Sequence, residues 1–235
     1  MIPARRASTR LPEKLLLDES GRPLLAHTVA CCLKSEQADR VVVATDDEDL
    51  AAIAEQEGAQ AILTDSELAS GSDRVWAAVE PRPEVARIAN VQGDEPEIDP
   101  AAVDRLLQLL QEGAAVGTLA APLPQAQISD PAAVKVVSDL QGRALYFSRA
   151  PIPYPRVNGG VSARLHVGLY AYRREALQSF AETPPSPLES TEGLEQLRFL
   201  EHGVPIQVLD WPQAFPGIDT RADYDAFLDR VRRQP

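Results

Sequence analysis

The sequence has few cysteines and few histidines for a chain of 235 residues. Its only cysteines, Cys31 and Cys32, are adjacent and cannot build a disulfide framework. No group of cysteines and histidines has the spacing of a zinc site. A chain without structural disulfides is typical of a reducing compartment, and we therefore expect a cytoplasmic protein.

Long apolar runs and a positive net charge are also absent. No run of about 18 apolar residues is present, so we expect no membrane-spanning helix, and no signal peptide opens the chain. The formal net charge of -12 argues against a surface for nucleic acids or anionic membranes. The hydrophobic content of 44% supports a sizeable core, and the length suits one large α/β domain or a domain with an inserted arm.

Short apolar runs alternate with helical patterns along the chain. Residues 40–45 and 87–91 read as buried strands, each delivering an acidic or polar turn. A helix that ends at Gln56 follows the first of these strands, with Thr45 or Asp46 as its cap. This alternation predicts an α/β fold, doubly wound, with a mostly parallel central sheet.

Four cations lie close together in a chain that is acidic overall. Arg5, Arg6, Arg10 and Lys14 follow a short apolar start, and Ser8 adds a hydroxyl donor. A loop that offers cations, hydroxyls and backbone N–H groups after a strand can bind phosphates. The alternative is a solvated basic loop, and the glycine-rich P-loop pattern is absent.

Two acidic residues are candidate metal ligands. Asp94 lies in a turn directly after the strand at 87–91, where open α/β sheets bind ligands. Asp219 lies just before the C-terminal helix. Carboxylate oxygens suit Mg²⁺, which usually takes only one or two of them beside substrate phosphates. The alternative for the first segment is a polar turn with no metal.

Several segments together resemble one enzyme family. The segments are Ile2–Leu17 (IPARRASTRLPEKLLL), Asn90–Pro96 (NVQGDEP), Ala144–Pro153 (ALYFSRAPIP), His166–Arg173 (HVGLYAYR), Pro185–Arg198 (PSPLESTEGLEQLR) and Gly217–Thr220 (GIDT). In this order they resemble the 3-deoxy-manno-octulosonate cytidylyltransferases, the CMP-Kdo synthetases, over nearly the whole chain.

The resemblance implies a Rossmann-like nucleotidyltransferase domain over residues 1–235. Within it, an excursion at about residues 122–175 would bind substrate and form a dimer. The implied reaction transfers CMP from CTP to 3-deoxy-D-manno-octulosonate (Kdo), with Mg²⁺, in a homodimer that serves lipopolysaccharide or related cell-envelope polysaccharide biosynthesis. Two alternatives stay open: a cytidylyltransferase for a related acid, an N-acylneuraminate or amino-substituted Kdo, and a non-catalytic nucleotide-binding protein.

The resemblance also implies roles for individual residues. The catalytic residues would be Arg10, Lys14 and Asp94, and the Mg²⁺ ligands Asp94 and Asp219. The nucleotide contacts would be Ala4, Arg5, Ser8, Arg10, Lys14, Ser70, Gly71, Ser72, Arg74 and Gln92. The sugar contacts would be Gln92, Arg149, His166, Tyr170, Glu195 and Gln196. Structural alternatives are an ion pair for Arg149, a core position for His166, a helix cap for Ser72, and a solvated face on one helix over Leu188–Glu201 for Glu195.

Two positions depart from the family pattern. Only Met1 precedes Ile2, so the first strand is expected to be short or its start misassigned. Glu13 stands where the family has glycine. Like charges about 4 Å apart repel by roughly 4 kcal/mol at an effective dielectric of about 20. A Glu13 carboxylate facing the triphosphate would therefore weaken nucleotide binding, whereas one facing solvent would change little.

Overall fold

The computed structural model describes residues 1–68, 70–157 and 162–233. The chain forms two compact units, one of Met1–Leu107 with Phe215–Pro235 and the other of Gln108–Ala214. The predicted excursion at about 122–175 falls within the second unit, and its residues 158–161 lie outside the described ranges. A single domain over 1–235 with that excursion stays a prediction.

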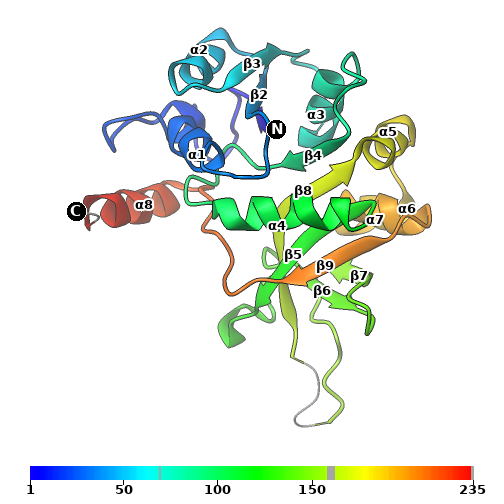
Figure 1. The fold of residues 1–235 in the computed structure, drawn as a ribbon. Coiled ribbons are helices and arrows are strands. Elements are labelled where there is room, and N and C mark those ends of the chain that lie inside the picture. The colour runs from blue at the N-terminus through cyan, green and yellow to red at the C-terminus, as the bar shows by residue number, and fades with distance from the viewer. Residues whose placement is uncertain (69, 158–161, 234–235) are drawn as a thin grey trace. The chain divides into compact units, whose positions relative to one another are not determined.

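The first unit is built on short parallel strands (Figure 1). Strands β1 (Ile2–Ala4), β2 (Val42–Thr45) and β3 (Gln60–Leu63) pair in parallel in that order. Strand β4 (Arg87–Asn90) lies beside β1, because Met1 donates its ammonium to the Ala89 carbonyl at 2.8 Å and its own carbonyl accepts from Val91 at 3.0 Å. The loops after β1 and β4 therefore emerge at the same edge of the sheet.

Helices of the first unit follow the strands in the predicted alternation. They are α1 (Leu24–Cys32), α2 (Glu48–Gln56), α3 (Gly71–Val79), α4 (Pro100–Gln111), which continues into the second unit, and α8 (Arg221–Arg233), with a 3-10 turn, η1 (Lys14–Leu16). The predicted cap of α2 was wrong by one residue or two. Asp47 caps this helix, because its carboxylate accepts the Leu50 N–H at 3.0 Å.

The strands of the second unit form a mixed sheet, with both parallel and antiparallel pairs. Its strands are β5 (Val116–Pro122), β6 (Lys135–Ser138), β7 (Ala144–Ser148), β8 (Arg164–Arg173) and β9 (Ile206–Asp210), in the order β7-β6-β8-β5-β9. The β5–β9 pair is parallel, whereas β5–β8, β6–β7 and β6–β8 are antiparallel. The α/β fold class is confirmed, and the predicted parallel pairing is concentrated in the first unit.

Helices of the second unit are short. They are α5 (Arg174–Glu182), α6 (Pro187–Glu192) and α7 (Gln196–Glu201), with a 3-10 turn, η2 (Gln125–Gln127). The prediction of one helix over Leu188–Glu201 was wrong, because Gly193 takes a left-handed conformation with φ 63° and ends α6. Across the described ranges, no helix is both long and apolar enough to cross a membrane.

Candidate active site

The basic loop, residues 5–14, leaves the buried strand β1 and ends in η1. Ala4 is buried at the end of the strand, while Arg5 and Arg10 are exposed and Ser8 is half-buried. Lys14 is only 8% exposed, and a lysine this buried normally has a charged partner. The loop thus presents cations to solvent along its length and draws its last one inward.

Lys14 joins two aspartates from distant parts of the chain. Its ammonium donates to Asp94 Oδ2 and, at 3.3 Å, to Asp219 Oδ1. Arg10 donates to the same Asp219 oxygen at 2.9 Å. Two carboxylates and two cations therefore meet at one place, on the sheet edge where β1 and β4 end.

The backbone explains why these groups converge. Ile218 donates its N–H to the Asp94 carbonyl at 2.9 Å, which joins the segment before α8 to the turn after β4. A Cβ at Gly93 would lie 3.2 Å from the Pro3 carbonyl oxygen, so the turn passes very close to β1. Glycine permits this approach, and Asp94 is carried beside the basic loop.

The paired aspartates fit a divalent cation. Their oxygens reach a single ammonium, so one cation already satisfies both carboxylates in this arrangement. Hard oxygen ligands in this number suit Mg²⁺ bound partly by substrate phosphates. Among the described residues no group of three or more candidate ligands occurs. Asp94 and Asp219 therefore stay the predicted ligands of a divalent metal, which two converging carboxylates suit.

Glu95 follows Asp94 in the turn, and its burial favours the neutral form of its carboxyl group. Burial, with a smaller contribution from the Asp94 charge, raises the pKa of Glu95 to about 8. Its Oε2 atom is buried and has no hydrogen-bond partner in the described part of the chain. At neutral pH the Glu95 carboxyl is therefore mostly protonated, which leaves Asp94 as the charged group of this turn.

The segment at Ser70–Arg74 lies close to β1 and to Gln92. A Cβ at Gly71 would lie 3.4 Å from the Pro3 ring and 3.8 Å from Gln92 Oε1. Three of the predicted nucleotide contacts, Ala4, Gly71 and Gln92, thus belong to neighbouring segments. The cap of α3 is Ser70, whose hydroxyl accepts the Asp73 N–H at 3.1 Å, so the alternative of a cap at Ser72 was wrong.

Arg74 is committed to the protein itself. It is 3% exposed and donates to Thr64 Oγ1 at 2.6 Å, to the Asp65 carbonyl at 3.2 Å and to Asp46 Oδ2 at 3.1 Å. These bonds hold the start of α3 to the ends of β2 and β3. A direct contact from Arg74 to a nucleotide stays a prediction.

The predicted sugar contacts of the second unit gather around β8. The His166 ring packs edge-on against Phe147 with centroids 5.0 Å apart and lies 5.4 Å from Tyr170. Burial lowers the pKa of His166 to about 3, so this imidazole is neutral at pH 7. The buried atom Gln196 Nε2 has no hydrogen-bond partner among the described residues.

Glu195 extends this cluster. Burial raises the pKa of Tyr170 well above its ordinary value, and the charges of Tyr172 and Glu195 act in the same direction. Histidine, tyrosine, glutamate and glutamine side chains offer the hydrogen-bond donors and acceptors that a polyhydroxy ligand needs.

Arg149 is anchored to backbone carbonyls. Its guanidinium donates to the carbonyls of Glu192 at 2.7 Å, Pro131 at 2.9 Å and Gly193 at 3.1 Å. Among the described residues these bonds fix the guanidinium within the protein through backbone carbonyls, whereas the structural alternative was an ion pair. A contact from Arg149 to the sugar stays a prediction.

Sequence reasoning missed Glu192, which organises the same corner. Its carboxylate accepts Ser148 Oγ at 2.6 Å and the Arg149 N–H at 2.9 Å. Glu192 lies inside the quoted segment Pro185–Arg198, directly before Gly193, and that position was the signal available.

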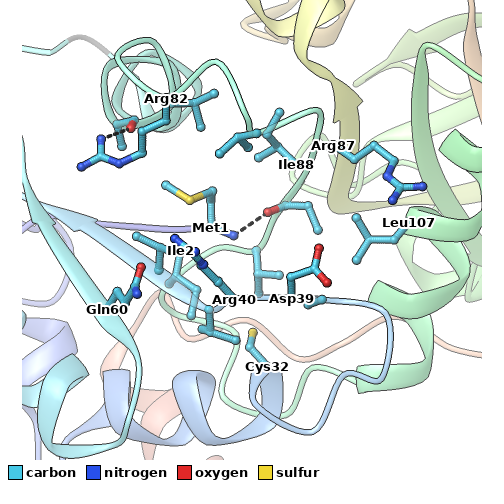
Figure 2. A pocket seen from close by; sticks show the side chains of 18 of the residues that line it. Met1, Ile2, Cys32, Asp39, Arg40, Gln60, Arg82, Arg87, Ile88 and Leu107 are labelled. Carbon is cyan, nitrogen blue, oxygen red and sulfur yellow. Dashed lines mark hydrogen bonds between the residues drawn. The ribbon is translucent and has the colours of Figure 1, made fainter.

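A separate cavity lies at the amino ends of the strands of the first unit (Figure 2). Its volume is about 440 Å³, and its lining includes Met1, Arg40, Arg82, Arg87 and Ile88. Burial lowers the pKa of the Met1 ammonium, which donates to Ala89 inside this cavity. None of the predicted site residues lines it.

Comparisons with known proteins agree with the geometry. A family profile described as "Cytidylyltransferase" matches residues 1–206. The chain is 48% identical over 237 residues to the 3-deoxy-manno-octulosonate cytidylyltransferase of Anaeromyxobacter sp. (strain Fw109-5), covering 99% of this chain and 94% of that one. It is 45% identical to the enzyme of that name from Acidobacterium capsulatum, covering 96% and 93%.

A solved structure is similar over the whole length. The structure of CMP:2-keto-3-deoxy-manno-octonic acid synthetase complexed with CTP has a TM-score of 0.95 and 38% sequence identity. The match covers 100% of this chain and 98% of that one. The resemblance drawn from the sequence is thereby confirmed, and the chain belongs to the 3-deoxy-manno-octulosonate cytidylyltransferase family.

Proposed function

We propose that this enzyme transfers CMP from CTP to 3-deoxy-D-manno-octulosonate, giving CMP-Kdo and pyrophosphate for lipopolysaccharide or related cell-envelope polysaccharide biosynthesis. The observation that carries the proposal is the convergence of Lys14 and Arg10 with Asp94 and Asp219 at one edge of the sheet. A CTP complex of a similar structure and relatives with this activity in their names support it.

The chain's own residues supply the charges that the reaction needs. The anomeric hydroxyl of the sugar would attack the α-phosphorus of CTP, and pyrophosphate would leave. Arg10 and Lys14 would bind the phosphates and stabilise the negative charge that builds up on the leaving pyrophosphate. Asp94 and Asp219 would hold Mg²⁺, which neutralises phosphate charge and acidifies a hydroxyl when it is bound.

The sugar would be bound by the cluster on β8 and α7. His166 is neutral at pH 7, and its Nε2 lies 3.3 Å from Thr118 Oγ1, which leaves the other ring nitrogen for the sugar. Glu195 would accept and Gln196 Nε2 would donate. The buried Gln196 Nε2, which has no hydrogen-bond partner among the described residues, supports this role. Arg149 would contribute through the segment that it anchors, and Gln92 stays a predicted sugar contact.

A homodimer in the cytoplasm is part of the proposal. Within the predicted dimerisation stretch, Leu140 and Leu145 are 100% and 62% exposed, and Tyr154 is 85% exposed. Large exposed apolar patches are typical of interaction surfaces, and these three side chains are the candidates for one in this stretch. Light scattering of the purified protein measures the mass, and a monomer at micromolar concentration would contradict this part.

The function is tested by pyrophosphate release from CTP and Mg²⁺ with a panel of sugar acids. We expect release with Kdo and at least about tenfold less with N-acetylneuraminate, since a site built for particular hydroxyls discriminates strongly. Release with another acid and not with Kdo would contradict the assignment of the sugar. CTP binding without release from any acid would favour a non-catalytic protein.

A further inference from the structure

The two ends of the basic loop are joined by an ion pair. Arg6 Nε and NH2 donate to Glu13 Oε1 at 2.9 and 2.8 Å. These bonds close residues 6–13 into a ring that contains Arg10. The Glu13 side chain is 59% exposed, so it is open to solvent as one of the two sequence alternatives had it, and its carboxylate pairs with an arginine of its own loop.

The ring is tied to the start of α2 through the same guanidinium. Arg6 NH1 donates to Asp47 Oδ2 at 3.0 Å and to Asp49 Oδ2 at 2.7 Å. Asp47 is itself fixed, because it caps α2 by accepting the Leu50 N–H at 3.0 Å. Arg6 thus connects the loop to a rigid part of the first unit and uses its charge within the protein.

Glu13 also sets the direction of the chain into Lys14. Its backbone is left-handed, with φ 50° and ψ 30°, and within the described ranges it is the one non-glycine residue with positive φ. Its carbonyl accepts the Leu16 N–H at 2.8 Å, which starts the 3-10 turn that carries Lys14 toward Asp94. Left-handed backbone is unfavourable for a residue with a side chain, so the bonds to Arg6 offset that cost.

We propose that Glu13 is a positioning residue for nucleotidyl transfer, which holds the basic loop through Arg6 so that Arg10 and Lys14 face the phosphates of CTP. The inference rests on the proposed function, because it takes the loop as the phosphate-binding segment. Since Arg6 neutralises the carboxylate, Glu13 helps nucleotide binding instead of opposing it.

Steady-state kinetics of Glu13→Gln with CTP as the varied substrate tests the proposal. This substitution keeps the shape of the side chain and removes its charge. We expect KM for CTP to rise about threefold or more, the size of a lost exposed ion pair in a network. We expect KM for Kdo to stay unchanged, which a merely structural role would not give, and the melting temperature to fall by no more than about 4 °C, as for one lost exposed ion pair.

Two further variants identify the partner. In an Arg6→Gln background, adding Glu13→Gln should change KM for CTP no further, because the pair is already broken. The matched control is Glu48→Gln, an exposed acid in the first turn of α2 that lies between the two partners of Arg6 at the start of this helix and is not one of them, and it should leave KM unchanged. At about 0.5 M salt the difference between wild type and Glu13→Gln should shrink, because exposed charges are screened.

Several results would overturn the proposal. An unchanged or lower KM for CTP in Glu13→Gln would do so, and so would full additivity of the two substitutions. A lower KM in Glu13→Gly, which also relieves the backbone, would show that Glu13 repels the nucleotide. Calorimetric titration of CTP without sugar acid keeps the two proposals separate: if the wild type releases no pyrophosphate, weaker CTP binding by Glu13→Gln still supports the positioning role, and equal binding contradicts it.

Discussion

Ile218 donates its backbone N–H to the carbonyl oxygen of Asp94 at 2.9 Å. This bond fastens the segment before α8 to the turn after β4, two parts of the chain separated by more than half its length. Asp219 is the next residue, so its carboxylate arrives beside that of Asp94 at the Lys14 ammonium. The candidate metal site thus depends on a backbone contact as well as on its two side chains.

The shared site predicts that each aspartate is essential. Asp94→Asn and Asp219→Asn should each lower Mg²⁺-dependent turnover by at least about 100-fold. Each substitution removes one charged ligand of the Mg²⁺ ion that would stabilise the transition state. Both variants should keep the far-UV circular dichroism spectrum and melting cooperativity of the wild type.

The control is Asp225→Asn on the exposed face of α8. Turnover within a few-fold of wild type in either site variant would exclude that residue as a metal ligand.

The phosphate-binding cations should act mainly on the reaction. Lys14→Ala and Arg10→Ala should each lower turnover at least about tenfold, because one lost transition-state contact costs roughly 3 kcal/mol. Lys34→Ala removes an exposed lysine that follows the end of α1 and serves as the matched control. The assignment fails if a folded Lys14→Ala or Arg10→Ala variant keeps the wild-type rate.

Because the pKa of His166 is lowered in the folded protein, we expect the protein to lose stability in acid. Its folded pKa is about 3 and its ordinary value is 6.5, so between these values the unfolded chain binds a proton that the folded chain does not. The free energy of unfolding should therefore fall as the pH drops below about 6.5. His166→Gln should lose less stability than wild type between about pH 7.5 and pH 5, whereas His202→Gln, at an exposed position, should follow wild type. Urea midpoints measure this, and equal pH slopes in wild type and His166→Gln would contradict it.

We expect a side chain at position 93 to destabilise the fold through steric conflict. A Cβ there would meet the Pro3 carbonyl oxygen at 3.2 Å and Leu15 Cδ1 at 3.4 Å, and the backbone of β1 cannot move freely. Gly93→Ala should lower the free energy of unfolding by about 1 to 3 kcal/mol. At Gly217, in the same unit, a Cβ would meet nothing within 4 Å, so Gly217→Ala should change it by less than about 0.5 kcal/mol. Equal stabilities of the two variants would show that the turn can move away from β1.

Much of the first unit follows from local sequence. The run at residues 40–45 gave β2 nearly to the residue, and the acidic cluster after it begins α2 as the dipole favours. Placing Asp94 and Asp219 at one sheet edge was also possible, because parallel strands align their carboxyl ends. These predictions rest on the periodicity of apolar residues and on the order of strands and helices, both of which can be read from one sequence.

Contacts that depend on side-chain competition were not predictable. Ser70 and Ser72 are both good caps, and only the observed bond to the Asp73 N–H selects Ser70. The helical pattern over Leu188–Glu201 hid the break at Gly193, because a glycine is tolerated in either state until tertiary packing decides.

The partners of charged residues were equally hidden. Arg149 donates to three backbone carbonyls, and Glu13 faces Arg6, yet charge and spacing alone fitted substrate, solvent and protein partners alike. The division of the chain at Leu107 has no sequence signal either, since α4 runs across it without a break.

The central claim is that this chain joins CMP to Kdo at the site of Lys14, Asp94 and Asp219. Mass spectrometry of a reaction with CTP, Kdo and Mg²⁺ tests it most directly, because it identifies the bond that is formed. The account predicts CMP-Kdo and an equal amount of pyrophosphate from the wild type, and neither above background from Asp94→Asn. CMP-Kdo made at the wild-type rate by Asp94→Asn, or no CMP-Kdo from the folded wild type, would contradict it.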